Sequence, residues 1–388
     1  MKLPIYLDYS STTPVDPRVA EKMCACLTPD GAFGNPASRS HAFGWEAEKL
    51  VDEARVNVAA LVGADPKEII WTSGATESDN LAIFGAASYR ADRGRHLVSM
   101  RTEHKAVTDV FERLAHDGFE VTWVKPRANG VLDAGDLAAA LRTDTQLVSV
   151  MLVNNETGVI QDVEHLGSIC RERDILFHVD AAQAVGKLHI DLAAMPIDLL
   201  SMTAHKCYGP KGIGALYIAD RPACHVEPLL FGGGQQRRIR PGTLPTELIA
   251  GFGMAAEIAA ERIDDDLAHL RELRRILWSG IGDIDGLLLN GHHDGFPGIL
   301  NVSVDGVEGE SLLLDLEPLL VATGSACNSK TQEPSYVLRA LGRTDLEAQS
   351  AIRFSFGRQT TAADVEFAAA RYRAAVGRLR DLAPGAAA

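Results

Sequence analysis

Residues 201–214 read Ser-Met-Thr-Ala-His-Lys-Cys-Tyr-Gly-Pro-Lys-Gly-Ile-Gly, and this stretch indicates how the chain is organised. Apolar runs flank it at 197–200 and 215–219, which predicts two buried strands around a polar, glycine-rich turn. The turn carries His205 and Lys206. An amine at the mouth of a buried strand loses solvent, its pKa falls, and it can then form an imine with a carbonyl group. A single loop lysine is more often a plain surface residue, so the rest of the chain has to decide.

The composition is that of an ordinary globular protein. Of 388 residues, 46% are hydrophobic and 23% charged, and the net charge is −14, so we expect no direct nucleic-acid partner. Apolar runs are too short to span a membrane, and the N-terminus lacks the apolar core of a signal peptide. The six cysteines lack the spacing of metal ligands. We therefore expect a cytoplasmic protein with free thiols and no metal site.

Short apolar segments alternate with helical periodicity through the first two thirds of the chain. Strands are predicted at 68–72, 96–100, 146–153 and 175–179, and helices at 47–62, up to 87, up to 115 and at 163–173. This alternation predicts βαβ units and a mostly parallel sheet, whose ligands bind beyond the carboxyl ends of its strands. The polar residues at those ends are Thr76, His104, Asn155, Asp180, Gln183, His205 and Lys206.

Taken singly, each of these residues has an ordinary explanation as a helix cap or a turn former. Together they match one ligand. Residues 73–76, including Ala75 and Thr76, offer amide N–H groups and a hydroxyl at a helix start, which suits a phosphate. Asp180 can keep a ring nitrogen protonated, His104 can stack on a flat ring, and Lys206 can hold an aldehyde. Phosphate, pyridinium and aldehyde are the groups of pyridoxal 5'-phosphate (PLP).

The last third of the chain predicts a smaller α/β domain. It contains a long amphipathic helix over 245–281, strands near 287–289, 299–304, 319–322 and 351–356, and helices at 309–316 and 362–382. A loop of small residues at about 323–334 carries Cys327, a candidate thiolate nucleophile. Arg353 in an apolar strand suits a carboxylate ligand. An unreactive loop thiol and an internal ion pair remain open for these two residues.

Several motifs resemble cysteine desulfurases of the NifS/IscS type, a group within the class V aminotransferase family. They are Asp8-Tyr-Ser-Ser-Thr-Thr-Pro14, Thr72-Ser-Gly-Ala-Thr-Glu-Ser-Asp-Asn80, Thr102-Glu-His-Lys105, Val153-Asn-Asn-Glu156, His178-Val-Asp180, His205-Lys206, Gly242-Thr-Leu-Pro245 and Gly324-Ser-Ala-Cys327. The resemblance extends from Met1 to about Leu382. A single motif would be weak, but this combination is highly specific.

The resemblance implies a fold-type I PLP enzyme. A large domain over 15–245 would hold a mostly parallel seven-stranded sheet between helices, and 1–14 with 246–388 would form a small α/β domain that carries the loop at about 323–334. The implied enzyme is a homodimer that converts L-cysteine to L-alanine. It would keep the sulfur as a persulfide on Cys327 and pass it to an acceptor protein.

The resemblance also implies residue roles. The catalytic residues would be Lys206, which holds PLP as an imine, His104, which stacks on the ring and moves protons, and Cys327, which attacks the substrate sulfur. The cofactor-binding residues would be Ala75, Thr76, His104, Asn155, Asp180, Gln183, Thr203, His205, Lys206 and, from the other subunit, Thr243. Asp180 would pair with the ring nitrogen and Gln183 with the ring oxygen. Asn155 and Arg353 would hold the substrate carboxylate.

Some positions depart from the family pattern. Thr203 and Ala204 stand where close relatives have Ser and Gly, and Thr keeps the hydroxyl. The chain ends at Ala388, before the tail with which housekeeping members dock the iron–sulfur scaffold, so tRNA thiolation and DNA phosphorothioation stand beside iron–sulfur assembly as expected roles.

A selenocysteine lyase or an aminotransferase on the same fold is the alternative. A silent binding protein would have lost Lys206, His104, Asp180 or Cys327, and all are present.

Overall fold

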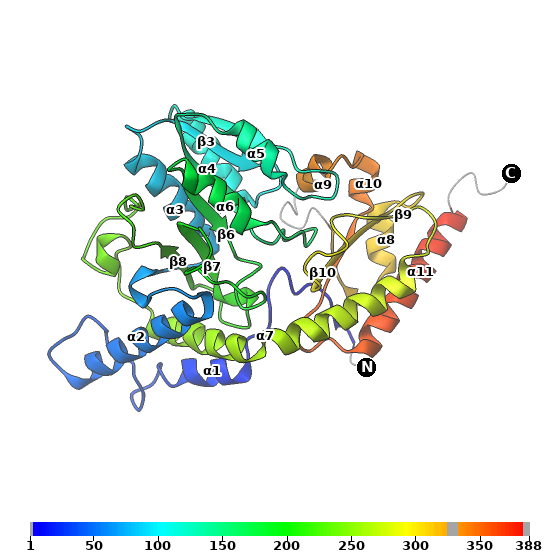
Figure 1. Cartoon of the computed structure of the whole chain (residues 1–388). Helices are drawn as coiled ribbons and strands as arrows, with labels where there is room; N and C mark the ends of the chain where they lie inside the picture. Colours follow the sequence, from blue (N-terminus) through cyan, green and yellow to red (C-terminus); the bar gives the residue numbers. More distant parts are fainter. Residues whose placement is uncertain (1–2, 324–332, 383–388) are drawn as a thin grey trace.

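The computed structural model describes residues 3–323 and 333–382, and its largest element is a seven-stranded sheet (Figure 1). The strand order is β2 (Ile69–Thr72), β8 (Gly214–Ile218), β7 (Leu199–Thr203), β6 (Leu176–Asp180), β5 (Thr145–Met151), β3 (His96–Met100) and β4 (Glu120–Val124). β8 runs antiparallel to both of its neighbours, and the other pairs are parallel. All strands except β4 are buried along their whole length, as in sheets covered on both faces. The predicted α/β class with a mostly parallel seven-stranded sheet is confirmed.

Helices connect and cover these strands. They are α2 (Ala42–Val62), α3 (Ala75–Tyr89), α4 (Lys105–His116), α5 (Ala134–Ala140) and α6 (Val163–Glu172). α3 begins three residues after β2, and α4 begins five residues after β3. Both helices therefore start at the carboxyl ends of parallel strands, where the sequence places the candidate site.

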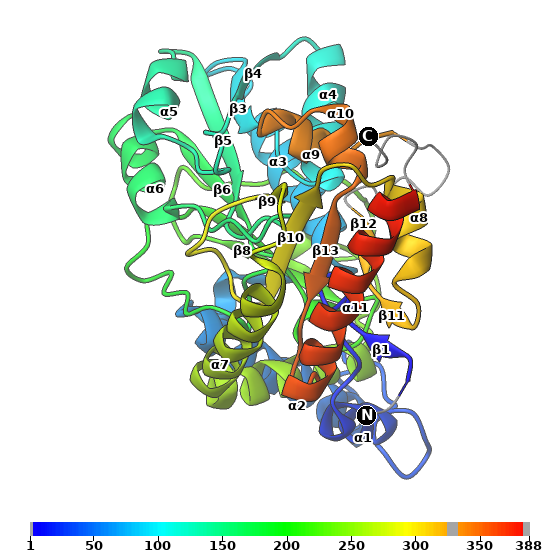
Figure 2. The ribbon, with the colours of Figure 1, turned by 90° about the vertical axis from the view of Figure 1, so that its right-hand side faces the viewer.

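A four-stranded antiparallel sheet forms the second part of the molecule, in the order β12 (Ala322–Thr323), β13 (Ile352–Ser355), β10 (Ile299–Val304) and β9 (Leu287–Leu289). The other elements here are β1 (Ile5–Tyr6), which pairs in parallel with β11 (Leu319–Leu320), and the helices α8 (Gly309–Asp315), α9 (Tyr336–Ala340), α10 (Asp345–Gln349) and α11 (Ala362–Leu382). Figure 2 shows α11 lying over β13, with β1 beside β11. Phe354 of β13 packs on Tyr372 of α11, with 5.7 Å between the ring centroids.

The long helix α7 (Thr246–Ile281) joins the two parts (Figure 1). Its first half packs against α2 and α1 (Pro17–Cys24), where Phe252 meets Trp71 of β2. Its second half packs against α11, where Gly280 lies against Ala369. We propose the division into a large domain over 15–245 and a small domain over 1–14 and 246–388. The pairing of β1 with β11 supports the assignment of the N-terminal segment to the small domain.

Among the described residues, no helix combines the length and the apolar character needed to cross a lipid bilayer.

Candidate active site

A cavity of about 480 Å³ lies at the carboxyl ends of the parallel strands. It brings together the residues predicted from the strand ends: Thr76, His104, Asn155, Asp180, Gln183, His205 and Lys206. Three further expected site residues also line it: Ala75, Thr203 and Arg353. Thr243 instead lines a second surface cavity with Asn35 and Arg39. Cys327 lies outside the described residues. The structure thus supports the rule that parallel strands deliver their terminal side chains to one place.

One part of the cavity wall is the amide cradle, which we define as residues 73–76 at the start of α3. Its N-cap residue is Gly74, so no side chain caps the first turn of the helix. Gly214 of β8 packs directly on Gly74, because a Cβ on Gly214 would lie 2.6 Å from the Gly74 Cα and 2.5 Å from the Met202 carbonyl oxygen. With Thr76 and Thr203 alongside, this wall offers N–H and O–H donors near a positive helix end. It suits a phosphate.

Glu77 lies at the edge of the cradle and connects it to a distant loop. Its Oε2 accepts a hydrogen bond from the Ser73 amide at 2.7 Å, and its Oε1 lies 2.8 Å from Nε of Arg240. The Arg240 guanidinium and the Ser73 contacts outweigh burial and hold the pKa of Glu77 below its ordinary value. This ion pair fastens the segment around residue 240 beside the cavity.

A second part of the wall is formed by Asp79 and Asp180. Together with Glu103, which is buried and does not line the cavity, they make up what we define as the carboxyl cluster. Asp180 ends β6, and its Oδ1 accepts the Ala182 amide at 2.8 Å. Burial, followed by the neighbouring Asp180 charge, raises the pKa of Asp79 well above its ordinary value. Burial also raises the pKa of Glu103. The raised pKa values favour the protonated forms of Asp79 and Glu103, and Asp180 and Asp79 line the cavity, an environment for a cationic ring nitrogen.

His178 of β6 supports this cluster from below. Its Nε2 lies 3.5 Å from Oδ1 of Asp79, and its two ring nitrogens hydrogen-bond to Ser149 Oγ at 2.8 Å and Ser201 Oγ at 2.9 Å. Complete burial lowers its pKa to about 3, so the ring is neutral.

His104 is the N-cap residue of α4, and its ring is oriented by the helix. The Ala106 amide donates to Nδ1 at 3.1 Å, and burial lowers the pKa of the ring. A neutral ring whose Nδ1 accepts a hydrogen bond carries its proton on Nε2. His104 is therefore poised to exchange a proton at Nε2.

His205 and Lys206 lie in a short 3₁₀ turn, Ala204–Lys206, directly after β7. The amide and the hydroxyl of Thr13 both donate to the His205 carbonyl oxygen, at 2.9 and 3.0 Å. The His205 ring is neutral, because burial and then the nearby lysines lower its pKa to about 4. The Ala204 methyl packs so closely on Gly209 that a Cβ at residue 209 would lie 2.8 Å from it. The turn is thus held in place on both sides.

Arg353 of β13 reaches the cavity from the small sheet. Its NH1 donates to the Asn155 carbonyl oxygen at 2.8 Å, and its NH2 to Asp8 Oδ1 at 2.7 Å and Ser11 Oγ at 3.0 Å. The internal ion pair that the sequence left open is therefore present. Its Nε has no hydrogen-bond partner among the described residues. Arg353 is both a structural link and a donor at the cavity.

Some cavity residues were not singled out from the sequence: Ser10, Ser11, Asp79, Met151 and Lys211. Asp79 had a usable signal, since it lies four residues after Ala75 and so on the same face of α3. Ser10 and Ser11 come from the N-terminal segment, whose place beside the cavity depends on the pairing of β1 with β11.

The described cysteines are poor nucleophiles where they are buried. Burial raises the pKa of Cys207, the neighbour of Lys206, to about 11, and the pKa values of Cys170 and Cys224 to about 12. Cys26 is also buried, and its pKa is raised for the same reason.

Comparison with known proteins places the chain in a family. The model of the family described as aminotransferase class-V matches residues 5–367, almost the whole chain. The chain belongs to the class-V aminotransferase family. Within it, the cysteine desulfurase IscS of Enterobacter sp. (strain 638) is 57% identical over 385 residues, which cover 99% of this chain and 95% of that protein. The resemblance to NifS/IscS proteins found in the sequence is thereby confirmed.

Solved structures of this class-V family share the architecture. A NifS-like protein superposes with a TM-score of 0.89 at 35% identity and covers 97% of this chain and 100% of its own. SspA, solved in complex with cysteine, superposes with a TM-score of 0.82 at 36% identity, over 92% of this chain and 100% of its own. The fold is therefore the fold-type I architecture of this family.

Proposed function

We propose that this class-V family member is a PLP-dependent cysteine desulfurase that converts L-cysteine to L-alanine and passes the sulfur to an acceptor. The observation that carries the proposal is the cavity itself. It gathers an amine, a neutral imidazole, a carboxylate pair and an amide cradle at the carboxyl ends of one parallel sheet. The cysteine desulfurase relative at 57% identity and the cysteine-bound structural neighbour support the choice of substrate.

The residues present fit PLP. Gly74 leaves the first turn of α3 without a side-chain cap, which is a cradle that a phosphate suits, with Ala75, Thr76, Thr203 and His205 around it. The buried carboxyl cluster suits a protonated ring nitrogen at Asp180, and Gln183 suits the ring oxygen. Lys206 would hold the aldehyde carbon. When bound, PLP supplies an electron sink for the substrate Cα.

The chain's own groups would then orient the substrate and move protons. Arg353 and Asn155 would hold its carboxylate, since both line the cavity. His104 would carry a proton at Nε2 next to the reacting atoms, since its Nδ1 is occupied by the Ala106 amide. The buried wall would exclude water from the cofactor ring.

Cys327 would supply the thiolate that attacks the substrate sulfur. A new S–S bond forms as the S–Cβ bond of the substrate breaks, and the electron pair of that bond stays with the carbon fragment, which takes up a proton and leaves as alanine. Cys327 keeps the sulfur as a persulfide. The alternatives among the buried described thiols are weak, because burial raises the pKa values of Cys26, Cys170, Cys207 and Cys224 and so disfavours their thiolates.

The enzyme would work as a homodimer. Thr243 is outside the cavity of its own chain, which is what a residue that serves the other subunit's phosphate site requires. Large apolar side chains are exposed near the second surface cavity, the one that Thr243 lines: Phe33, Phe43 and Trp45. Light scattering at several concentrations tests this, and a monomer that binds PLP fully would contradict it.

The acceptor would be a protein of iron–sulfur cluster assembly or of nucleic-acid thiolation (tRNA thiolation or DNA phosphorothioation). The IscS relatives support the first of these. Transfer of labelled sulfur to candidate acceptors would distinguish them.

The deciding experiment is alanine release from L-cysteine by the PLP-loaded protein, with persulfide detected by mass on the peptide that contains Cys327. Lys206→Ala and Cys327→Ser should each abolish turnover, and the first should also remove the visible absorption of the bound cofactor. Alanine release that persists in Cys327→Ser would contradict the nucleophile. Release of alanine from selenocysteine alone, or amino transfer to a 2-oxo acid, would favour the selenocysteine lyase or the aminotransferase instead.

A further inference from the structure

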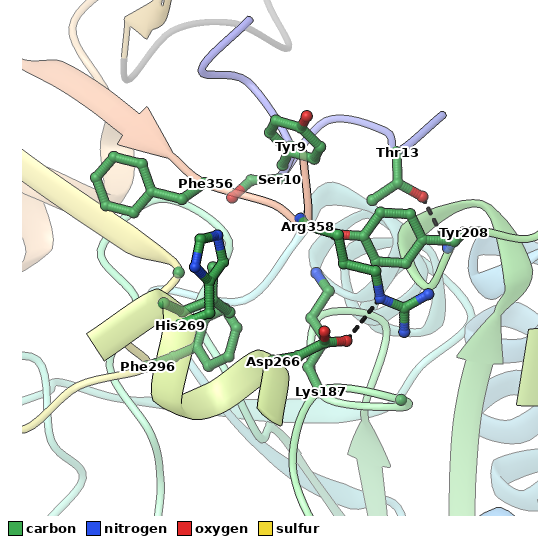
Figure 3. A pocket seen from close by; sticks show the side chains of 13 residues that line it. Tyr9, Ser10, Thr13, Lys187, Tyr208, Asp266, His269, Phe296, Phe356 and Arg358 are labelled. Carbon is green, nitrogen blue, oxygen red and sulfur yellow. Dashed lines mark hydrogen bonds and ion pairs between the residues drawn. The ribbon is translucent and has the colours of Figure 1, made fainter. Parts of the chain in front are cut away.

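A third, small cavity of about 30 Å³ is drawn in Figure 3, and it adjoins the active-site cavity at Ser10. Lys187, Tyr208, Asp266, His269 and Arg358 line it, and Ser10 lines both cavities. Gln183 faces the active-site cavity and Lys187 faces the small one. These two side chains, four residues apart after β6, therefore form a partition between the two spaces.

Gln183 makes two hydrogen bonds in this partition, one as an acceptor through Oε1 and one as a donor through Nε2. Lys187 Nζ donates to Gln183 Oε1 at 2.8 Å, and Gln183 Nε2 donates to the Ser10 carbonyl oxygen at 2.7 Å. A backbone carbonyl can only accept, so the Ser10 carbonyl must face the N–H side of the amide, while the Lys187 amine donates to the oxygen side. The two neighbours together exclude the flipped amide. The remaining N–H of Nε2 is then the polar hydrogen that Gln183 can offer to the active-site cavity.

Lys187 is an unusual residue to find in this place. It is half-buried, desolvation lowers its pKa to about 7, and the nearby Lys206 and Arg353 charges act in the same direction. Asp266, the acid in the small cavity, is already bound to Arg358, with 2.6 Å between Asp266 Oδ2 and Arg358 Nε (Figure 3). No carboxylate of the described residues lies within ion-pair distance of Lys187 Nζ. A half-buried amine without an acidic partner costs stability, and its contact with Gln183 offers a functional reason for it.

We infer that Lys187 is a positioning residue that fixes the amide of Gln183 so that an N–H faces the active-site cavity. The inference rests on the proposed binding of PLP, whose ring oxygen is the acceptor that this N–H suits. Lys187 itself lines the small cavity and does not line the active-site cavity. Its Nζ lies 5.7 Å from the centroid of the Phe296 ring, so an apolar substitute can pack against that ring.

The test is a double-mutant cycle on the full-length, PLP-loaded protein. Lys187→Met removes the donor and keeps a side chain of similar length. We expect PLP to be released about fivefold faster, measured as loss of visible absorption after dilution into an excess of an apoprotein that captures PLP. In a Gln183→Ala background, Lys187→Met should have no further effect, because the amide through which it acts is gone.

Three variants define the controls. Lys187→Arg keeps a donor and has the small cavity to accommodate it, so release should stay within about twofold of wild type. Lys67→Met removes an exposed lysine and should change nothing. If Lys187→Met does not fold, Lys187→Gln replaces it, since its donor atom is one bond shorter and should no longer reach Gln183.

The inference is overturned if the Lys187 substitution accelerates release equally in both backgrounds, or has no effect in wild type, or if Lys187→Arg behaves like Lys187→Met. The proposed function fails separately. A wild-type protein that never acquires the visible absorption of bound PLP contradicts the cofactor assignment, whereas a loaded wild type with an unaffected Lys187→Met variant contradicts this inference alone.

Discussion

The amide cradle and the carboxyl cluster line the same cavity, yet they prepare it for a ligand by different means. The cradle uses backbone N–H groups at a helix start and two glycines in contact, so its charge preference comes from peptide dipoles. The cluster uses buried carboxyl groups, and burial raises the pKa values of two of them, Asp79 and Glu103, so its preference depends on protons. The difference teaches that substitutions should act through shape in the cradle and through charge in the cluster.

The largest effect is expected at Asp180. Asp180→Ala removes the carboxylate proposed to hold the ring nitrogen, and alanine release by the PLP-loaded enzyme should fall about 10²–10³-fold, because a buried charge loses its partner. Steady-state kinetics with saturating PLP measures this. Asp180→Asn, which keeps the shape, should lose nearly as much. A fully active Asn variant would remove the contrast between charge and shape.

The next effect is expected at Gly214 in the cradle. Gly214→Ala places a Cβ 2.6 Å from the Gly74 Cα, and this overpacking should cost about 1–3 kcal/mol of stability and weaken PLP binding. Urea denaturation and PLP titration measure the two. Gly377→Ala in α11 is the matched control, since a Cβ there meets nothing within 4 Å, and it should stabilise by up to about 1 kcal/mol. Equal behaviour of the two variants would contradict a shape-determined cradle.

A pH series on the apoprotein examines the cluster. The raised pKa of Asp79 means that the folded protein keeps a proton that the unfolded chain loses, so this stabilisation is present at acidic pH and disappears as pH rises. Asp79→Asn should therefore gain stability relative to wild type between pH 5 and 8, by at most about 1.4 kcal/mol per pH unit. Urea midpoints at each pH measure it.

Glu103→Gln should follow the same sign, because burial also raises the pKa of Glu103. Asp65→Asn is the opposite control. Hydrogen bonds from Lys67 lower the pKa of Asp65, so its contribution is present at neutral pH and lost on acidification. A pH-independent difference for Asp79→Asn would show that the cluster does not store a proton there.

The smallest effect is expected at Thr203, whose hydroxyl lies alongside the amide cradle. Thr203→Ser keeps the hydroxyl and should leave PLP affinity within about twofold, whereas Thr203→Val removes it and should weaken binding about two- to tenfold. PLP titrations of both variants measure this. A weakened Ser variant would mean that the Thr methyl group, rather than the hydroxyl, matters to the cradle.

The residues at the strand ends were predicted well from the sequence, because the carboxyl ends of parallel strands lie at one edge of the sheet. Asp180, Asn155 and His104 could be placed at one edge without knowing which strand neighbours which. β4 was not predicted, since it is a partly exposed edge strand with a weak apolar signal. The contact of Arg353 with Asp8 joins residues 345 positions apart, and no local pattern carries such information. The hydrogen bond from Gln183 to the Ser10 carbonyl oxygen could not be predicted for the same reason, because it depends on how the N-terminal segment packs beside β6.

The long helix α7 has a consequence for how this protein can change over evolution. Because one continuous element supplies the packing partner of Trp71 at one end and of Ala369 at the other, neither half can be exchanged for a foreign one without repacking the other. Recombination breakpoints near Pro245 would strip α1 and α2 of their cover. The two sheets are therefore inherited together, and new specificities are expected to arise by substitution in the loops around the cavity rather than by shuffling of halves.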